Sequence, residues 1–190
     1  MSSLPTRAEA LETLRKAGCP NSVVKHSLLV AEIAKEIASR IDPKVKVDRD
    51  LVEVGALLHD IGRSVTHDVK HGLIGAEILE KMRYPERLVR LVRNHVGAGI
   101  PREEAIRLGL PPIDHIPSTV EEKVVCYADK LACGSTRVTF EKALKGFAED
   151  LGSNHPALAR LRCLHEEIVE LMEGASHGAR PHREDTASKT

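Results

Sequence analysis

Residues 55–63 read GALLHDIGR, an apolar helical turn that ends in a histidine followed by an aspartate. Adjacent residues on a helix do not face each other, so His59 and Asp60 gain little by pairing with one another. Both side chains leave the last apolar turn of the segment at the same place. Their position therefore predicts a shared partner that other parts of the chain help to bind.

The rest of the chain is helical by pattern. Apolar residues recur at helical spacing in a series of segments: 6–18, 21–41, 49–59, 71–82, 86–96, 101–108, 124–133, 136–149 and 156–173. Asp48 can cap the helix that carries His59, and Ser118 with Glu121 can form a capping box before the 124–133 helix. No alternating strand pattern occurs. The sequence predicts one all-α domain over residues 1–173, followed by a polar, disordered tail over 174–190.

Composition argues against several classes of function. The 28 basic and 28 acidic side chains cancel, so no overall field favours nucleic acid or an anionic membrane. Trp is absent and Tyr and Phe number two each, which leaves few platforms for stacking bases. No membrane-length apolar stretch, secretory signal or CxxC pair occurs. We therefore expect a cytoplasmic protein with reduced thiols, no membrane span, and nucleic acid as an unlikely partner.

Three more histidines and one aspartate are predicted to face inward. His26, His71 and His95 each continue the apolar stripe of their own helix, and Asp129 lies in a helix that is apolar almost all round. An unpartnered buried carboxylate is costly, and a lone buried histidine usually bonds a backbone carbonyl. With the HD pair, however, inward polar positions occur on five helices, and one bound cation explains them together. Imidazole nitrogen with carboxylate oxygen suits Fe, Mn, Co or Zn better than Ca.

These residues carry a family resemblance. His26, then His59-Asp60 within HDIG, then Asp129 within YADK, resembles the H…HD…D signature of the HD-domain metal-dependent phosphohydrolases. An HD dipeptide alone is a weak signal, whereas the ordered set in an LLHDIGR context is a specific one. The resemblance covers roughly residues 20–135. It implies an HD-domain helical bundle with a metal centre in its core.

The extra histidines resemble the HDIG subgroup that holds two metals. The resemblance implies a set of six metal ligands: His26, His59, Asp60, His71, His95 and Asp129. Asp60 would bridge the first metal to a second one held by His71 and His95. Two divalent transition metals per chain are expected, with Fe, Mn or Co preferred and Zn, Ni or Mg as alternatives.

The implied reaction is hydrolysis of a nucleotide-like small phosphate ester by a metal-activated hydroxide, with an anhydride as the second substrate class. Two metals can lower the pKa of a bound water and clamp an in-line displacement at phosphorus, so no Ser or Cys nucleophile is required. Asp60, Arg63 and Lys130 are the expected catalytic residues. Arg63 follows HDIG directly, and its planar fork suits phosphate. Lys130 follows Asp129.

Other functions stay open from the sequence. A non-catalytic HD module could bind a nucleotide or a partner as a sensor, because a fold does not guarantee activity. The complete ligand set favours the enzyme over this alternative. In a mononuclear nucleotide phosphomonoesterase, His71 and His95 would bind phosphate instead of metal. The apolar helix pair at the C-terminus makes a homodimer a further option.

Overall fold

Nine α-helices form the part of the chain that the computed structural model describes, residues 3–174. They are α1 (Arg7–Lys16), α2 (Asn21–Arg40), α3 (Arg49–Leu58), α4 (His71–Lys81), α5 (Glu86–Asn94), α6 (Arg102–Arg107), α7 (Val120–Lys130), α8 (Phe140–Leu151) and α9 (Pro156–Glu173). The predicted all-α class is confirmed. The expected tail lies outside the described residues from 175 onward, and the homodimer remains a prediction.

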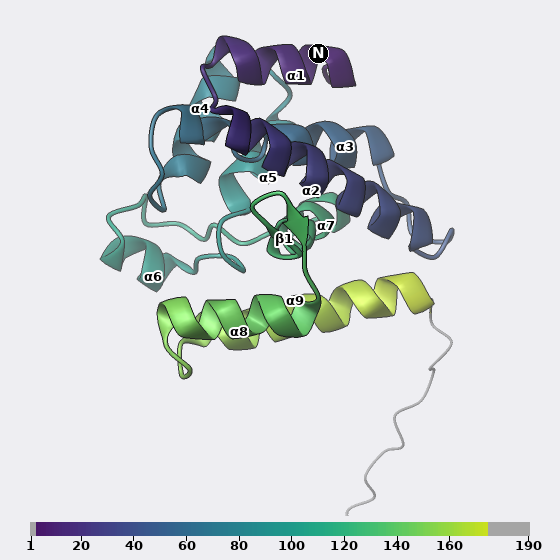
Figure 1. The fold of residues 1–190 in the computed structure, drawn as a ribbon, viewed down its shortest axis with the longest axis vertical. Helices are drawn as coiled ribbons and strands as arrows, with labels where there is room; N and C mark the ends of the chain where they lie inside the picture. Colours follow the sequence, from purple (N-terminus) through teal and green to yellow (C-terminus); the bar gives the residue numbers. More distant parts are fainter. Residues whose placement is uncertain (1–2, 175–190) are drawn as a thin grey trace, which may run out of the picture.

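The HDIG stretch lies at the centre of the bundle. Helix α3 packs against α1, α2 and α7, and α4 packs against α5 and the 3-10 turn η1 (Ile61–Ser64). Leu57, Leu58 and Ile61 are fully buried, and each such side chain contributes about 1.5–3 kcal/mol by leaving water. Figure 1 shows α8 and α9 side by side beneath the bundle. Burial of the apolar residues on both sides of His59-Asp60 therefore places that pair inside the molecule.

The segment around α7 differs from the predicted boundaries. The N-cap of α7 is Thr119, whose hydroxyl accepts from the backbone N–H of Glu122, so the predicted capping box of Ser118 and Glu121 is wrong. The capping position shifts by one residue because Glu122 is buried. Its carboxylate accepts from the backbone N–H of Ser118 at 2.8 Å and from Nε of Arg90 at 2.5 Å. The local capping pattern does not reveal this ion pair, in which Glu122 is buried and Arg90 is partly exposed.

A short hairpin separates two helices that the pattern places almost end to end. Helix α7 ends at Lys130, β1 (Ala132–Cys133) pairs antiparallel with β2 (Thr136–Arg137), and α8 begins only at Phe140. Gly134 has a φ of 58° in the turn, a left-handed conformation that favours glycine. The hairpin contacts α2 as well as α7, which brings its turn beside His26.

Within residues 3–174, no helix combines the length and the apolar character needed to cross a membrane.

The predicted cap of α3 gives a first test of stability. The Asp48 carboxylate accepts from the backbone N–H of Leu51 at 3.0 Å and also pairs with Arg87. We expect Asp48→Ala to lower the free energy of unfolding by about 1 kcal/mol, because the helix loses its cap. Asp48→Asn should cost less, since an amide oxygen can still cap. Urea unfolding of both variants checks this.

The same carboxylate should make part of the stability pH-dependent. Burial opposes ionisation of Asp48, but the Leu51 N–H and Arg87 outweigh it and hold the pKa below its usual value. A depressed carboxyl pKa stabilises the fold at neutral pH, and this contribution is lost as pH falls through the folded-state pKa. The difference in the free energy of unfolding between wild type and Asp48→Ala should therefore become smaller at acidic pH. This explanation would be contradicted if the difference in unfolding free energy did not change with pH. It would also be contradicted if the neighbouring Asp50→Ala lowered the unfolding free energy by the same amount.

Candidate metal centre

Six side chains from five separate places in the fold meet at one buried point, which we call the His/Asp cluster: His26, His59, Asp60, His71, His95 and Asp129. Helix α2 carries the first and α7 the last. His59 ends α3, His71 begins α4, and His95 ends α5. Each residue that the sequence predicts as a ligand is therefore brought to the same place, although long stretches of chain separate them.

The four imidazole rings have the same orientation toward the cluster. Each Nδ1 bonds a backbone carbonyl oxygen: His26 to Gly134 at 2.9 Å, and His59 to Ala56, His71 to Asp68 and His95 to Val92, each at 2.7 Å. A carbonyl oxygen can only accept, so the Nδ1 atoms carry the protons. In the neutral rings, every Nε2 then points inward with a free lone pair. Such bonds fix the tautomer and ring orientation of metal-binding histidines.

The ends of two helices explain why His59 and His95 leave the apolar face where they do. Each is the C-cap of its helix, and Ala56 and Val92 belong to the last turns, whose carbonyls lack a partner within the helix. The Nδ1 protons satisfy these carbonyls. Because the C-terminal end of a helix carries partial negative charge, two helix ends also favour a cation between them.

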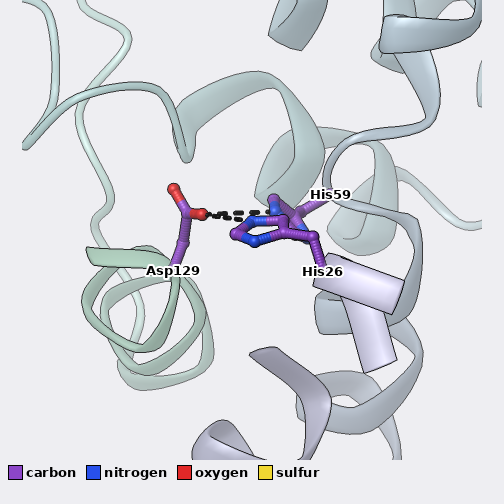
Figure 2. Close-up of side chains that lie close together, drawn as sticks. All are labelled: His26, His59 and Asp129. Carbon is purple, nitrogen blue, oxygen red and sulfur yellow. Dashed lines mark hydrogen bonds and ion pairs between the residues drawn. The ribbon is translucent and has the colours of Figure 1, made fainter. Parts of the chain in front are cut away.

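One half of the cluster consists of His26, His59 and Asp129 (Figure 2). Oδ1 of Asp129 lies 2.9 Å from Nε2 of His26 and 3.5 Å from Nε2 of His59. The other carboxylate oxygen of Asp129 pairs with Nζ of Lys130. This half thus offers two nitrogen atoms and one oxygen atom on one side of the cluster.

Asp60 connects this half to the other one. Its Oδ1 lies 3.3 Å from Nε2 of His71 and 3.5 Å from Nε2 of His95, which are 3.1 Å from each other. Its Oδ2 lies 3.7 Å from Nε2 of His59 and accepts from Nε of Arg63 at 2.7 Å. One oxygen of Asp60 therefore faces each half, the arrangement that a bridging ligand needs.

The residues fit a divalent cation. Nε2 of His59 and Oδ1 of Asp60 are buried and have no hydrogen-bond partner among the described residues, although such a group costs about 1–3 kcal/mol. His71 and His95, when neutral, also direct lone pairs at each other across 3.1 Å. A cation relieves all of these costs together. The mixed nitrogen and oxygen donor set suits Fe, Mn, Co or Zn.

The charge states also suit metal binding. Burial opposes ionisation of Asp60 and Asp129, but the adjacent imidazoles and Lys130 outweigh it, so the pKa of each carboxyl is well below its usual range. Burial and the neighbouring His95 lower the pKa of His71 to about 3. At neutral pH the two carboxyl groups are therefore ionised and His71 is neutral, which are the forms that bind metal.

The other two predicted catalytic residues lie at the edge of the cluster. Arg63 and Lys130 both line a pocket of about 750 Å³ that also includes His26 and Asp129, and we call this the polar pocket. Each cation is paired with a carboxylate of the cluster: Arg63 with Asp60, and Lys130 with Asp129. The structure therefore gives them two possible tasks, holding those carboxylates and attracting an anion into the pocket.

Helix α8 supplies much of the remaining wall of the polar pocket, a role that the sequence analysis missed. Lys142, Gly146 and Phe147 all line the pocket. The pattern identified a helix here but not what it faces. One signal was present in the sequence: Phe147 is one of only two phenylalanines, and it lies on a helix none of whose residues is fully buried.

Comparison with known proteins agrees with this geometry. The sequence matches the HD domain family over residues 23–134, a range that holds all six side chains of the His/Asp cluster. This chain belongs to the HD domain family. The resemblance seen in the H…HD…D signature is thereby confirmed. Helices α8 and α9, and with them much of the polar pocket, lie beyond the matched range.

Relatives of this HD domain protein have varied descriptions. A protein of Methanocaldococcus jannaschii described as uncharacterised is 47% identical over 166 residues, which cover 87% of this chain and 98% of the relative. A tRNA (cytidine(56)-2'-O)-methyltransferase of Picrophilus torridus is 37% identical, with 88% of this chain and 48% of the relative covered. Ribonuclease Y of Alkaliphilus metalliredigens is 28% identical, with 73% of this chain and 26% of the relative covered. This chain thus spans about half or less of the two named enzymes.

Among solved structures, the HD domain of the Listeria monocytogenes phosphodiesterase PgpH, in complex with cyclic-di-AMP, has a similar fold. Its TM-score is 0.52 at 18% sequence identity, with 92% of this chain and 100% of that domain covered. At 18% identity, the structural similarity shows a common fold only. Together with the family match, it confirms the predicted HD-domain helical bundle, and the structure itself places the His/Asp cluster in the core.

Proposed function

We propose that this HD domain protein is a metal-dependent phosphohydrolase that cleaves a phosphate ester of a nucleotide-like small molecule, with a phosphate anhydride as the second substrate class. The observation that carries the proposal is the convergence of four oriented Nε2 atoms and two carboxylates in a cluster whose His26 and Asp129 line the polar pocket. A divalent metal bound there supplies Lewis acidity toward phosphate and lowers the pKa of a bound water.

The protein's own groups have separable tasks in this proposal. Asp60 holds the two halves of the cluster together through its two oxygens. Arg63 fixes Oδ2 of Asp60 through Nε, while its Nη2 makes no hydrogen bond within residues 3–174 and can bind a phosphate oxygen. Lys130, only 9% exposed, adds a second positive charge at the same wall. Together they would orient a phosphate against the cluster.

The comparisons support a phosphodiester more than a monoester. The names phosphodiesterase and ribonuclease both belong to proteins that resemble this chain. The methyltransferase name points to a different activity, and this chain spans only 48% of that relative. RNA is the less favoured substrate because the net charge is zero and the arginines of α5 are each paired with a carboxylate.

The test is product-resolved hydrolysis of a small panel by protein supplied with Mn or Fe(II) without oxygen. The panel contains a 2′,3′-cyclic nucleotide, a 3′,5′-cyclic nucleotide, a nucleoside monophosphate, diadenosine tetraphosphate and a short oligoribonucleotide. We expect one small nucleotide to be cleaved and chelation to abolish the reaction. Binding of metal without cleavage of any member would overturn the proposal and favour a sensor.

Counting the metals in the same samples tests the ligand set. Two ions per chain are expected if Asp60 bridges both halves of the cluster. A firm ratio of one would remove the bridging role and favour the mononuclear phosphomonoesterase, in which His71 and His95 bind phosphate.

Replacing Arg63 tests its proposed role. Arg63→Gln removes both the hydrogen bond to Asp60 and the charge that would bind phosphate, so we expect kcat/KM to fall about 10–100-fold. Steady-state kinetics on the cleaved substrate measure this. Arg15→Gln is the matched control, because Arg15 lies outside the pocket lining and pairs with Glu12 on the surface of α1. Similar losses in both variants would show a general charge effect and contradict the assignment.

A further inference from the structure

A second pocket adjoins the polar pocket. It has a volume of about 330 Å³ and is lined largely by apolar groups from the 96–100 loop, Val69, Leu108, Phe147 and Leu151; we call it the apolar pocket. The two pockets share Phe147 and Asp150 in their walls. Its volume lies at the lower end of the range for small-molecule sites, which are mostly apolar with a few polar groups.

The apolar pocket is lined by chain segments next to His71 and His95, although no member of the cluster lines it. The 96–100 loop begins directly after His95, and Val69 precedes His71 by two residues. The polar pocket includes His26 and Asp129 instead. The two pockets meet at Phe147 and Asp150, so a molecule with a phosphate beside His26 and Asp129 could extend past Phe147 into the apolar pocket.

Phe147 stands between the two pockets and close to the cluster. Its ring centroid is 5.7 Å from Nζ of Lys130, which pairs with Asp129. The other phenylalanine, Phe140, has a structural partner instead, because its ring stacks on His165 with centroids 3.7 Å apart. Phe147 is thus an aromatic face on the pocket walls and not part of the closed core.

Four polar side chains, Glu104, Asp150, His155 and Arg160, also line the apolar pocket. Nη2 of Arg160 pairs with Oε2 of Glu104 at 2.7 Å, and Nε of Arg160 is buried with no acceptor among the described residues. The wall therefore contains both donor and acceptor groups. The edge of a nucleobase likewise presents both donors and acceptors.

We infer that the apolar pocket binds the nucleobase of a substrate whose phosphate lies at the His/Asp cluster, with Phe147 as the surface on which the base stacks. This inference rests on the proposed function and narrows its substrate class to base-bearing phosphates. Phe147 would act as a specificity residue, because it touches the base and not the reacting phosphorus.

The chain contains no tryptophan, so Phe147→Trp creates a single fluorescent reporter in the pocket. We would titrate the metal-loaded variant with AMP and with ribose 5-phosphate, which differ only in the base. AMP is expected to change the emission and to bind about tenfold more tightly, as base stacking on an aromatic side chain predicts. Phe140→Trp is the control, because it places the reporter on the same helix outside both pockets, and its emission should not respond. Phe147→Ala, followed by calorimetry, should bring AMP affinity down to that of ribose 5-phosphate.

Hydrolysis of bis(p-nitrophenyl) phosphate by the wild-type protein separates this inference from the proposed function. If this ester is cleaved but AMP and ribose 5-phosphate bind alike, the base pocket is wrong and the hydrolase stands. If AMP is preferred but neither this ester nor any panel member is cleaved, the pocket is upheld as a nucleotide site and the hydrolase is wrong.

Discussion

Asp60→Asn is expected to lower the hydrolysis rate by at least about 10³-fold, equivalent to the several kcal/mol that metal ions contribute to such reactions. The variant keeps the size of the side chain but removes the charge that faces both halves of the cluster. One Asp60 oxygen lies within 3.5 Å of Nε2 of both His71 and His95. Loss of the carboxylate should therefore also lower the number of metal ions bound per chain.

Metal content by elemental analysis and kcat on the cleaved substrate measure the two effects independently. Asp68→Asn is a matched control, since Asp68 serves His71 through its backbone carbonyl and its exposed side chain lies outside the cluster. It should retain both metal and activity. An Asp60→Asn protein that keeps the wild-type rate and metal content would remove Asp60 from the site.

Gly62→Ala is expected to be the most destabilising single-methyl change, with a loss of at least about 3 kcal/mol in the free energy of unfolding. A Cβ at Gly62 would lie 1.9 Å from the carbonyl oxygen of His71 and 2.7 Å from the backbone nitrogen of Gly75. Both are backbone atoms of α4, so no side-chain rotation can relieve the clash. The helix must move and take His71 with it.

Gly146→Ala offers the same substitution where space is available. A Cβ at Gly146 meets nothing within 4 Å, and the residue lies inside α8, so alanine should stabilise by about 0.5–1 kcal/mol. Urea unfolding of both variants should give shifts of opposite sign. Equal changes in the free energy of unfolding would show that the effect of Gly62→Ala arises from the unfolded chain and not from contact with α4.

The fold class and the six members of the cluster were predictable because each depends on a local pattern. His26, His71 and His95 could be identified from the apolar stripe of their own helix, without knowing what lay opposite. The need for glycine at position 62 is different in kind, because it comes from a close approach of two backbone segments that only the packed fold reveals.

Features that depend on distant contacts were not predictable. Near the α7 cap, the buried Glu122 pairs with Arg90, a residue 32 positions earlier. The hairpin around Gly134 occupies residues that the pattern assigns to the ends of two successive helices, 124–133 and 136–149. Phe147 faces two pockets only because α8 folds back beneath the bundle (Figure 1).

The carbonyl partners of the four imidazoles differ in one respect that bears on assembly. His59, His71 and His95 each bond the carbonyl oxygen three residues earlier, so local backbone fixes the orientation of these rings. His26 instead bonds Gly134, which is 108 residues away in the hairpin. The fourth ring is therefore aligned only when the hairpin docks on α2. Occupancy of the cluster and docking of the hairpin are consequently linked equilibria, and whatever stabilises one stabilises the other.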